Sequence, residues 1–187
     1  MNNYLIILMG TSGVGKSETA KELSKRGYEW ISLDKIIKKK YPNKDNNSLN
    51  KRELEEIFEE FYSKANSILK KNKNLVVDEW FYEKESLEKF LEKIGEIDKR
   101  KIHYFHLIAG LEEVIKRNRK KKNPLKEKEV IKHYELTFKS PGESYIEKAP
   151  VKLNTEKISP KEVSEHILNH ILFNEKTSIS NERDEYF

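Results

Sequence analysis

A glycine-rich segment near the start of the chain has the residue types and spacing that bind phosphate groups. It satisfies the pattern GxxxxGK[ST] at every position. Its glycines allow the backbone to turn so that successive N–H groups face one anion. We therefore expect a nucleoside triphosphate, ATP, to be bound by the residues Gly10, Thr11, Ser12, Gly13, Val14, Gly15, Lys16 and Ser17.

The last two residues of this segment have separate expected roles. The ammonium group of Lys16 would reach the β- and γ-phosphates and act in catalysis, and the hydroxyl group of Ser17 would be a ligand of Mg²⁺. A helix that opens at Lys16 would add its positive N-terminal end to the phosphate site.

Two carboxylates follow a short apolar run farther along the chain. The run Asn74 to Asp78, followed by Glu79, has the form of a Walker B strand, in which an acidic residue closes a buried strand. We expect Asp78 to hold Mg²⁺ directly or through water. Glu79 could act as a base, help to position the metal, or be solvated.

Asp34 follows a second apolar segment and is a candidate catalytic base. Its carboxylate could accept the proton of an acceptor hydroxyl as that oxygen attacks phosphorus. The alternative is that Asp34 caps a helix that begins at Lys35, and the two roles can coexist.

The excess positive charge of the chain is concentrated in one segment. Residues 116–128 contain eight Lys or Arg and one acidic residue, whereas the rest of the chain holds 29 basic and 31 acidic residues. This distribution favours a specific anion over general coating of nucleic acid. Arg117 or Arg119 could neutralise a phosphoryl group in transfer, while Lys120 to Lys122 are interpreted as bystanders. The break at Asn123-Pro124 would separate two helices of a lid, residues 114–128, that closes over the site; the alternative is a solvated helix end.

These residues require a scaffold, and strands alternate with helices along the chain. The pattern predicts a parallel sheet with helices on both faces, with the second strand beside the first. It predicts one domain over residues 1–173 and a polar, disordered tail over 174–187. Strands are expected at 4–9, 28–33, 74–78, 101–108 and 151–153, and helices at 16–26, 51–71, 84–94, 111–122, 126–138 and from Ser159-Pro160 onward.

Over residues 4 to about 172, these motifs resemble the P-loop kinases of the nucleoside-monophosphate-kinase type. That group includes shikimate and gluconate kinases, chloramphenicol phosphotransferase and the kinase domain of polynucleotide kinases. The resemblance implies a three-layer P-loop NTPase fold with a five-stranded parallel sheet and a helical lid. It also implies ATP, Mg²⁺, a lid arginine and a carboxylate base at the position of Asp34.

The end of the chain extends the resemblance. Leu153-Asn154-Thr155 followed by Ser159-Pro160 is similar to the final strand and turn of these kinases, which in that family packs against adenine. The resemblance thus assigns Thr155 to nucleotide binding.

The chain departs from the family in two ways. Its lid arginines are two residues apart rather than four, with Lys121 where the second would fall. The glycine run that binds shikimate is missing after Asp78, so shikimate itself is not expected.

The expected function is transfer of the γ-phosphoryl group of ATP to a hydroxyl or phosphate of a small molecule, nucleoside or nucleotide. One alternative is a polynucleotide 5′-hydroxyl kinase, whose partner would be a nucleic acid end. Another is an NTP-binding ATPase or switch without an acceptor. The chain has no Cys, which excludes disulfides and fits a cytoplasmic location. No apolar run approaches the ~20 residues of a membrane span, so no membrane partner is expected.

Overall fold

The structure is a computed structural model that describes residues 3–44, 48–79, 81, 84–121, 124–139 and 151–184. Helices and strands alternate through these ranges, as the hydrophobic pattern predicts. In chain order the elements are β1 (Leu5–Met9), α1 (Lys16–Ser24), β2 (Glu29–Ile31), α2 (Leu33–Lys40), α3 (Lys51–Lys70), β3 (Leu75–Asp78), α4 (Lys84–Lys93), a 3-10 turn η2 (Lys99–Lys101), β4 (Ile102–Ile108), α5 (Leu111–Arg119), α6 (Glu127–Lys139), β5 (Val151–Asn154) and α7 (Pro160–Asp184).

The five strands form one parallel sheet, in the order β2-β3-β1-β4-β5. The predicted five-stranded parallel sheet is therefore confirmed, but the predicted position of the second strand is wrong. β3 lies between β1 and β2. The apolar run of β3 is buried on both faces, whereas Glu29 and Trp30 of β2 are only half-buried. A fully apolar strand suits the middle of a parallel sheet, and a partly polar strand suits its edge.

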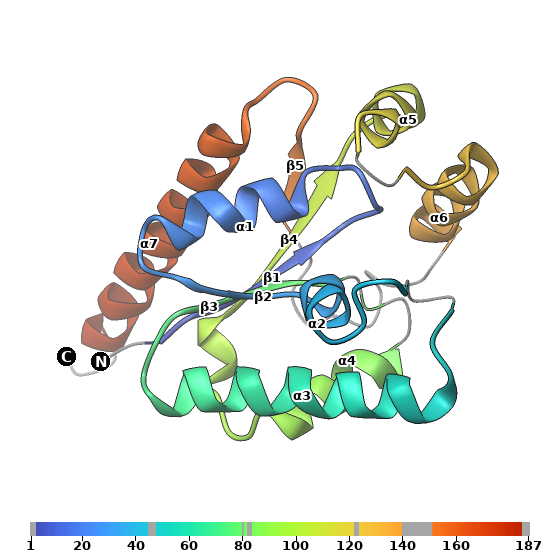
Figure 1. The fold of residues 1–187 in the computed structure, drawn as a ribbon. Coiled ribbons are helices and arrows are strands. Elements are labelled where there is room, and N and C mark those ends of the chain that lie inside the picture. Colours follow the sequence, from blue (N-terminus) through green and yellow to red (C-terminus); the bar gives the residue numbers. More distant parts are fainter. Residues whose placement is uncertain are drawn as a thin grey trace.

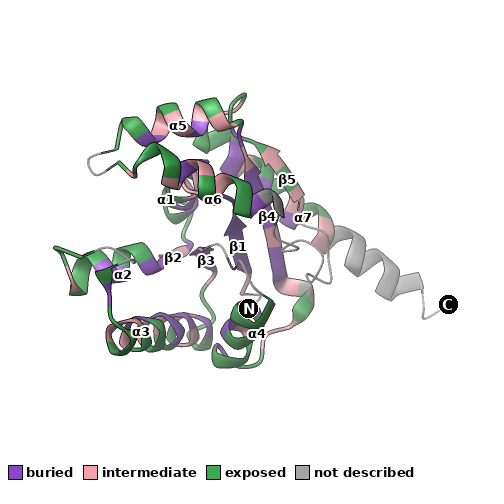
Figure 2. Cartoon of the chain, turned by 90° about the vertical axis from the view of Figure 1, so that its right-hand side faces the viewer, coloured by how far each residue is buried: buried purple, intermediate pink, exposed green. Residues whose placement is uncertain are grey.

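Helices cover both faces of the sheet and complete the three layers. Helices α1 and α7 lie on one face, and α2, α3 and α4 lie on the other (Figure 1). Side chains of β1 alternate between two cores: Leu5 and Ile7 belong to one, Ile6 and Leu8 to the other. The buried strands run through the middle of the molecule while the outer helix surfaces are exposed (Figure 2).

The long helix α3 begins where its sequence provides a capping box. The side chain of Asn50 accepts a hydrogen bond from the backbone N–H of Glu53, and the Glu53 carboxylate accepts one from the N–H of Asn50. These bonds satisfy two backbone donors at the helix start. The helix buries Ile57, Phe61 and other apolar residues against the sheet, although Phe58 of the same pattern is 36% exposed.

Helix α7 is longer than the sequence pattern indicates. It extends to Asp184, so residues 174–184 are helical rather than the disordered tail expected for 174–187; residues 185–187 lie outside the described part. No glycine or proline follows Pro160 in the sequence to end the helix. Within the described ranges, no helix combines the length and apolar character needed to cross a membrane.

Candidate phosphate-binding site

The glycine-rich segment forms a loop between β1 and α1, at the edge of the sheet where the parallel strands end. Gly15 precedes the helix with a φ of 102°, and Gly10 has a φ of 128°. A Cβ atom at Gly10 would overlap the carbonyl oxygen of Leu107. Glycine is therefore required at position 10 both by backbone conformation and by the close approach of β4.

The side chain of Lys16 folds back across this loop. Its Nζ donates to the carbonyl oxygen of Gly10 at 2.6 Å and to that of Thr11 at 3.3 Å. The ammonium group is thus held at the loop, where helix α1 also presents the N–H groups of its first turn, which have no acceptor within the helix. This arrangement suits the binding of a phosphate group.

The two predicted magnesium ligands lie in direct contact. The hydroxyl group of Ser17, on α1, donates to Oδ2 of Asp78, at the end of β3, at 2.6 Å. Asp78 is only 5% exposed. A hydroxyl beside a buried carboxylate is an oxygen donor set of the kind that Mg²⁺ takes.

The rest of a magnesium coordination sphere would come from outside the protein. Among the described residues, no group of three or more His, Cys, Asp or Glu side chains could hold a metal ion. A site with one protein carboxylate is normal for Mg²⁺, which keeps several waters and shares substrate phosphates. Glu79 follows Asp78 directly and is half-buried; its role stays a prediction.

Asp34 lies at the same edge, in the first turn of α2. The helix begins at Leu33 with Ser32 as its N-cap residue, so the alternative interpretation of Asp34 as the cap is wrong. Ser32 has an extended conformation and immediately precedes the helix. The helix starts at Leu33, two residues before the expected start at Lys35. The Asp34 carboxylate is exposed and within electrostatic reach of the Lys121 ammonium group.

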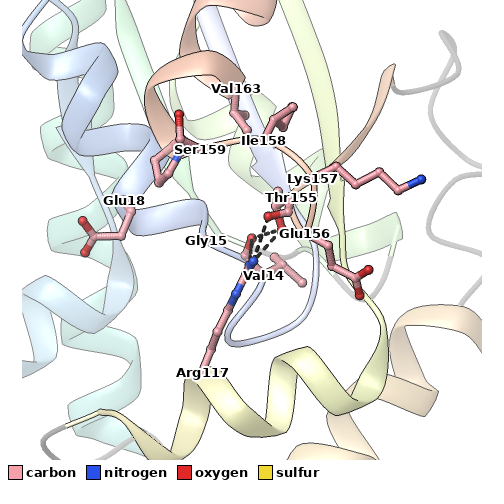
Figure 3. A pocket seen from close by; sticks show the side chains of 11 residues that line it. Val14, Gly15, Glu18, Arg117, Thr155, Glu156, Lys157, Ile158, Ser159 and Val163 are labelled. Atoms are coloured by element: carbon pink, nitrogen blue, oxygen red, sulfur yellow. Dashed lines mark hydrogen bonds between the residues drawn. The ribbon is translucent and has the colours of Figure 1, made fainter.

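A cavity of about 440 Å³ adjoins the phosphate loop (Figure 3). Thr155, which follows β5, joins this cavity to the loop: its hydroxyl donates to the carbonyl oxygen of Val14 at 2.8 Å. The structure thus places Thr155 beside the loop, and its assignment to nucleotide binding stays a prediction. The residues lining the cavity are Val14, Gly15, Glu18, Arg117, Thr155, Glu156, Lys157, Ile158, Ser159, Pro160 and Val163.

Arg117 connects helix α5 to this cavity. Its guanidinium group donates to the hydroxyl of Thr155 at 3.0 Å and to the Thr155 carbonyl at 2.7 Å. Its Nε also donates to Glu113 at 2.8 Å, and this bond, followed by the one from Lys116, lowers the pKa of the Glu113 carboxyl. Figure 3 shows the Arg117 side chain reaching from α5 toward Val14 and Thr155. The structure therefore holds Arg117 beside this cavity.

The second lid candidate has a different partner. Arg119 forms an exposed ion pair with Glu127 at 2.7 Å, and this pair links the end of α5 to α6. The expected break between the two helices is present, and residues 122 and 123 within it lie outside the described part of the chain.

Sequence reasoning missed one residue at the loop. Lys121, interpreted as a bystander, donates from Nζ to the hydroxyl of Ser12 at 2.9 Å. Burial of the ammonium group, followed by the charge of Lys16, lowers the pKa of Lys121. The only sequence signal for this residue is its position four residues after Arg117, where the family pattern places a second arginine.

Known proteins match this chain at the level of a family and a fold. A family model described as an AAA domain matches residues 6–138. No curated protein sequence matches the chain. A gluconokinase from Sinorhizobium meliloti 1021 matches with a TM-score of 0.62 and 16% identity, over 95% of this chain and 97% of that one. A shikimate kinase from Acinetobacter baumannii matches with a TM-score of 0.59 and 21% identity, over 92% and 94%.

A chain of the Pnkp1/Rnl/Hen1 RNA repair complex is also similar. The TM-score is 0.63 and the identity 18%, over 74% of this chain but only 45% of that one, so the present chain spans less than half of that protein. At these identities the likenesses establish the fold. The chain has the three-layer fold of the P-loop kinases, as its motifs predict.

Proposed function

We propose that this chain, which belongs to the AAA-domain family, transfers the γ-phosphoryl group of ATP to an oxygen of a small molecule, nucleoside or nucleotide. One observation carries the nucleotide half of the proposal: the contact between Ser17 and Asp78 joins the phosphate loop to the carboxylate at the end of β3. A loop that only bound phosphate would not need this carboxylate, whereas a site for a magnesium–triphosphate complex does. The P-loop kinase fold supports transfer to an acceptor.

Substrate binding uses the groups already gathered at the loop. The backbone N–H groups of the segment 10–17 donate to the phosphates of ATP. Lys16 exchanges its contacts with the Gly10 and Thr11 carbonyls for the β- and γ-phosphates. Ser17 and Asp78 would hold Mg²⁺, which would supply neutralisation of the phosphate charge.

The cavity beside the loop would receive the base of the nucleotide. Its volume of about 440 Å³ falls within the range of small-molecule sites. Thr155 and Arg117 form its floor next to Val14, so they fix the base relative to the phosphate loop. In this proposal Arg117 positions the nucleotide.

In the transfer step the protein itself forms no covalent bond to the phosphoryl group. The acceptor oxygen forms a bond to the γ-phosphorus, while the bond from that phosphorus to the β–γ bridging oxygen breaks and leaves its electron pair on ADP. When the acceptor is a hydroxyl, its proton passes to the carboxylate of Asp34. Asp34 is suited to this role because it is exposed at the edge of the sheet where the phosphate loop lies.

A polynucleotide 5′-hydroxyl kinase is the second candidate. The likeness to a chain of an RNA repair complex favours it, and so does the basic segment 116–128. Such an acceptor would be held through its backbone phosphates, and its affinity would fall steeply with salt concentration. A small neutral acceptor would bind with little dependence on salt.

The test is a transfer assay with γ-labelled ATP. The acceptor panel contains nucleosides, nucleotides, sugars, aminoglycosides and 5′-hydroxyl oligonucleotides, and Lys16→Ala is assayed beside the wild type. The proposal predicts label in at least one acceptor with the wild type and almost none with Lys16→Ala. Steady release of labelled phosphate with no labelled acceptor would instead support an ATPase, with Glu79 the candidate to orient water.

A further inference from the structure

The connection between α5 and α6 holds one lysine of the basic segment in a defined position. The side chain of Asn118 is buried and spans this connection: its Nδ2 donates to the carbonyl oxygen of Leu125 at 2.8 Å, and its Oδ1 accepts from the Leu125 N–H at 3.2 Å. The backbone N–H of Lys121 also donates to the Asn118 carbonyl at 3.0 Å. Lys121 therefore follows directly on a braced turn.

From this turn Lys121 reaches the phosphate loop. Its ammonium group donates to the hydroxyl of Ser12, a residue 109 positions earlier in the chain. Lys120 and Lys121 are both exposed, but within the described ranges a bond to the loop is present for Lys121 alone. Of these two adjacent lysines, Lys121 is the one that the fold directs to the loop.

The charges around Lys121 favour an anion between them. Lys16 and Lys38 face it with the same sign, from the phosphate loop and from α2, while Asp34 and Asp78 face it from α2 and β3. Burial and the charge of Lys16, in that order, lower the pKa of Lys121. Like charges brought close together cost free energy, and a bound polyanion relieves that cost.

We propose that Lys121 is a catalytic residue whose ammonium group contacts the γ-phosphoryl group of ATP during transfer. This inference rests on the proposed function. Lys121 supplies from the α5–α6 connection the positive charge that the sequence interpretation assigned to Arg117 or Arg119. Those two arginines are engaged with Thr155 and Glu127, respectively. Lys16 and Lys121 would approach the phosphoryl group from two elements and stabilise the charge on its oxygens.

The first test is binding, because it requires no knowledge of the acceptor. Calorimetry compares Mg-ATP with Mg-ADP for the wild type, Lys121→Met, Lys121→Gln and the matched control Lys120→Met. Loss of a charge-assisted bond predicts that both Lys121 variants bind Mg-ATP about tenfold more weakly and Mg-ADP with nearly unchanged affinity. Lys120→Met should match the wild type with both nucleotides. Because Gln keeps a donor for Ser12, it separates the charge from the loop contact.

The second test is turnover, with whichever acceptor or hydrolysis assay reports on the wild type. Removing one stabilising charge predicts that kcat falls by about 10²–10³ in Lys121→Met, while KM for the acceptor changes little. Lys121→Arg should restore much of kcat. Since the pKa of Lys121 is lowered in the free protein, kcat/KM for ATP should decline as pH rises through it, and Lys121→Arg should move that decline to higher pH.

The outcomes distinguish this inference from the proposed function. If the wild type does not bind Mg-ATP, the proposed function fails and the inference fails with it. If the wild type binds Mg-ATP and Lys121→Met binds it equally well, only the inference fails. Equal losses for ATP and ADP, or a full affinity for ATP in Lys121→Gln, would reduce Lys121 to a structural contact of the loop and overturn the catalytic role.

Discussion

The hydroxyl group of Ser17 and the carboxylate of Asp78 lie 2.6 Å apart, although 61 residues separate them in the chain. The contact arises because β1 and β3 are neighbours in a parallel sheet and end at the same edge. Ser17 follows β1 in the first turn of α1, and Asp78 closes β3. Adjacent strands thus bring together a hydroxyl and a carboxylate that neither segment could provide alone.

Replacement of Ser17 by alanine should remove much of the benefit of Mg²⁺ for nucleotide binding. We expect the Mg²⁺-dependent gain in ATP affinity to fall by about tenfold, because one oxygen ligand is lost while the loop amides remain. Calorimetric titration with ATP in the presence and absence of Mg²⁺ measures this gain. Ser24→Ala, the same change at an exposed position of α1, is the control and should behave as the wild type. An unchanged Mg²⁺ effect in Ser17→Ala would place the metal elsewhere.

Replacement of Asp34 by asparagine should impair transfer to a hydroxyl acceptor. Loss of a general base predicts a fall in kcat of about 10²–10⁴ with ATP affinity unchanged. Asp98→Asn is a control for the chemical change alone, because Asp98 precedes β4 and so lies toward the opposite edge of the sheet. Steady-state kinetics with the identified acceptor provide the measurement. A full rate in Asp34→Asn would remove Asp34 from the mechanism.

Thr155→Val should weaken both the fold and nucleotide binding. The hydroxyl of Thr155 bonds the Val14 carbonyl and receives a bond from Arg117. Leaving these buried partners unsatisfied should lower the free energy of unfolding by about 1–2 kcal/mol. Urea denaturation gives the stability, and titration with Mg-ADP gives the affinity.

Thr137→Val is the control for Thr155→Val. Thr137 is equally buried, and among the described residues its hydroxyl bonds within α6, to the carbonyl of His133. It should alter stability without altering nucleotide affinity. If the two variants have the same effect on affinity, Thr155 has no particular role at the loop.

Two glycine substitutions should lower the free energy of unfolding by different amounts. Gly27 has a φ of 90° and open space where a Cβ would stand, so Gly27→Ala should cost only backbone strain, about 1–2 kcal/mol. Gly10→Ala adds an overlap with the Leu107 carbonyl and should cost about 3 kcal/mol or more. Urea denaturation of both variants tests the difference. Equal losses would contradict the tight approach of the loop to β4.

Motifs that act through adjacent residues were predictable from the sequence. The loop 10–17 and the strand that ends at Asp78 combine a local pattern with an apolar run, so their structure can be read from short segments, and their chemistry stays a prediction. The parallel sheet follows from alternation of strands and helices. By contrast, the alternation of strands and helices does not give the order of the strands in the sheet. The edge position of β2 becomes clear only when its half-buried residues are compared with the fully buried residues of β3.

Roles that depend on distant partners were not predictable in this way. Arg117 and Lys121 belong to one basic run, and composition does not separate them. Their different contacts arise because α5 directs Arg117 to Thr155, while the turn braced by Asn118 directs Lys121 to Ser12. A sequence pattern records neither the direction of a helix nor the bridge across a turn.

Calorimetric titration of the wild-type protein with Mg-ATP tests the central claim most directly, with Lys16→Ala and the exposed-helix control Lys21→Ala beside it. We predict saturable binding at one site in the wild type and in Lys21→Ala, and an affinity at least about tenfold weaker in Lys16→Ala. The absence of heat with the wild type at millimolar nucleotide, or equal binding by Lys16→Ala, would contradict a triphosphate site at this loop.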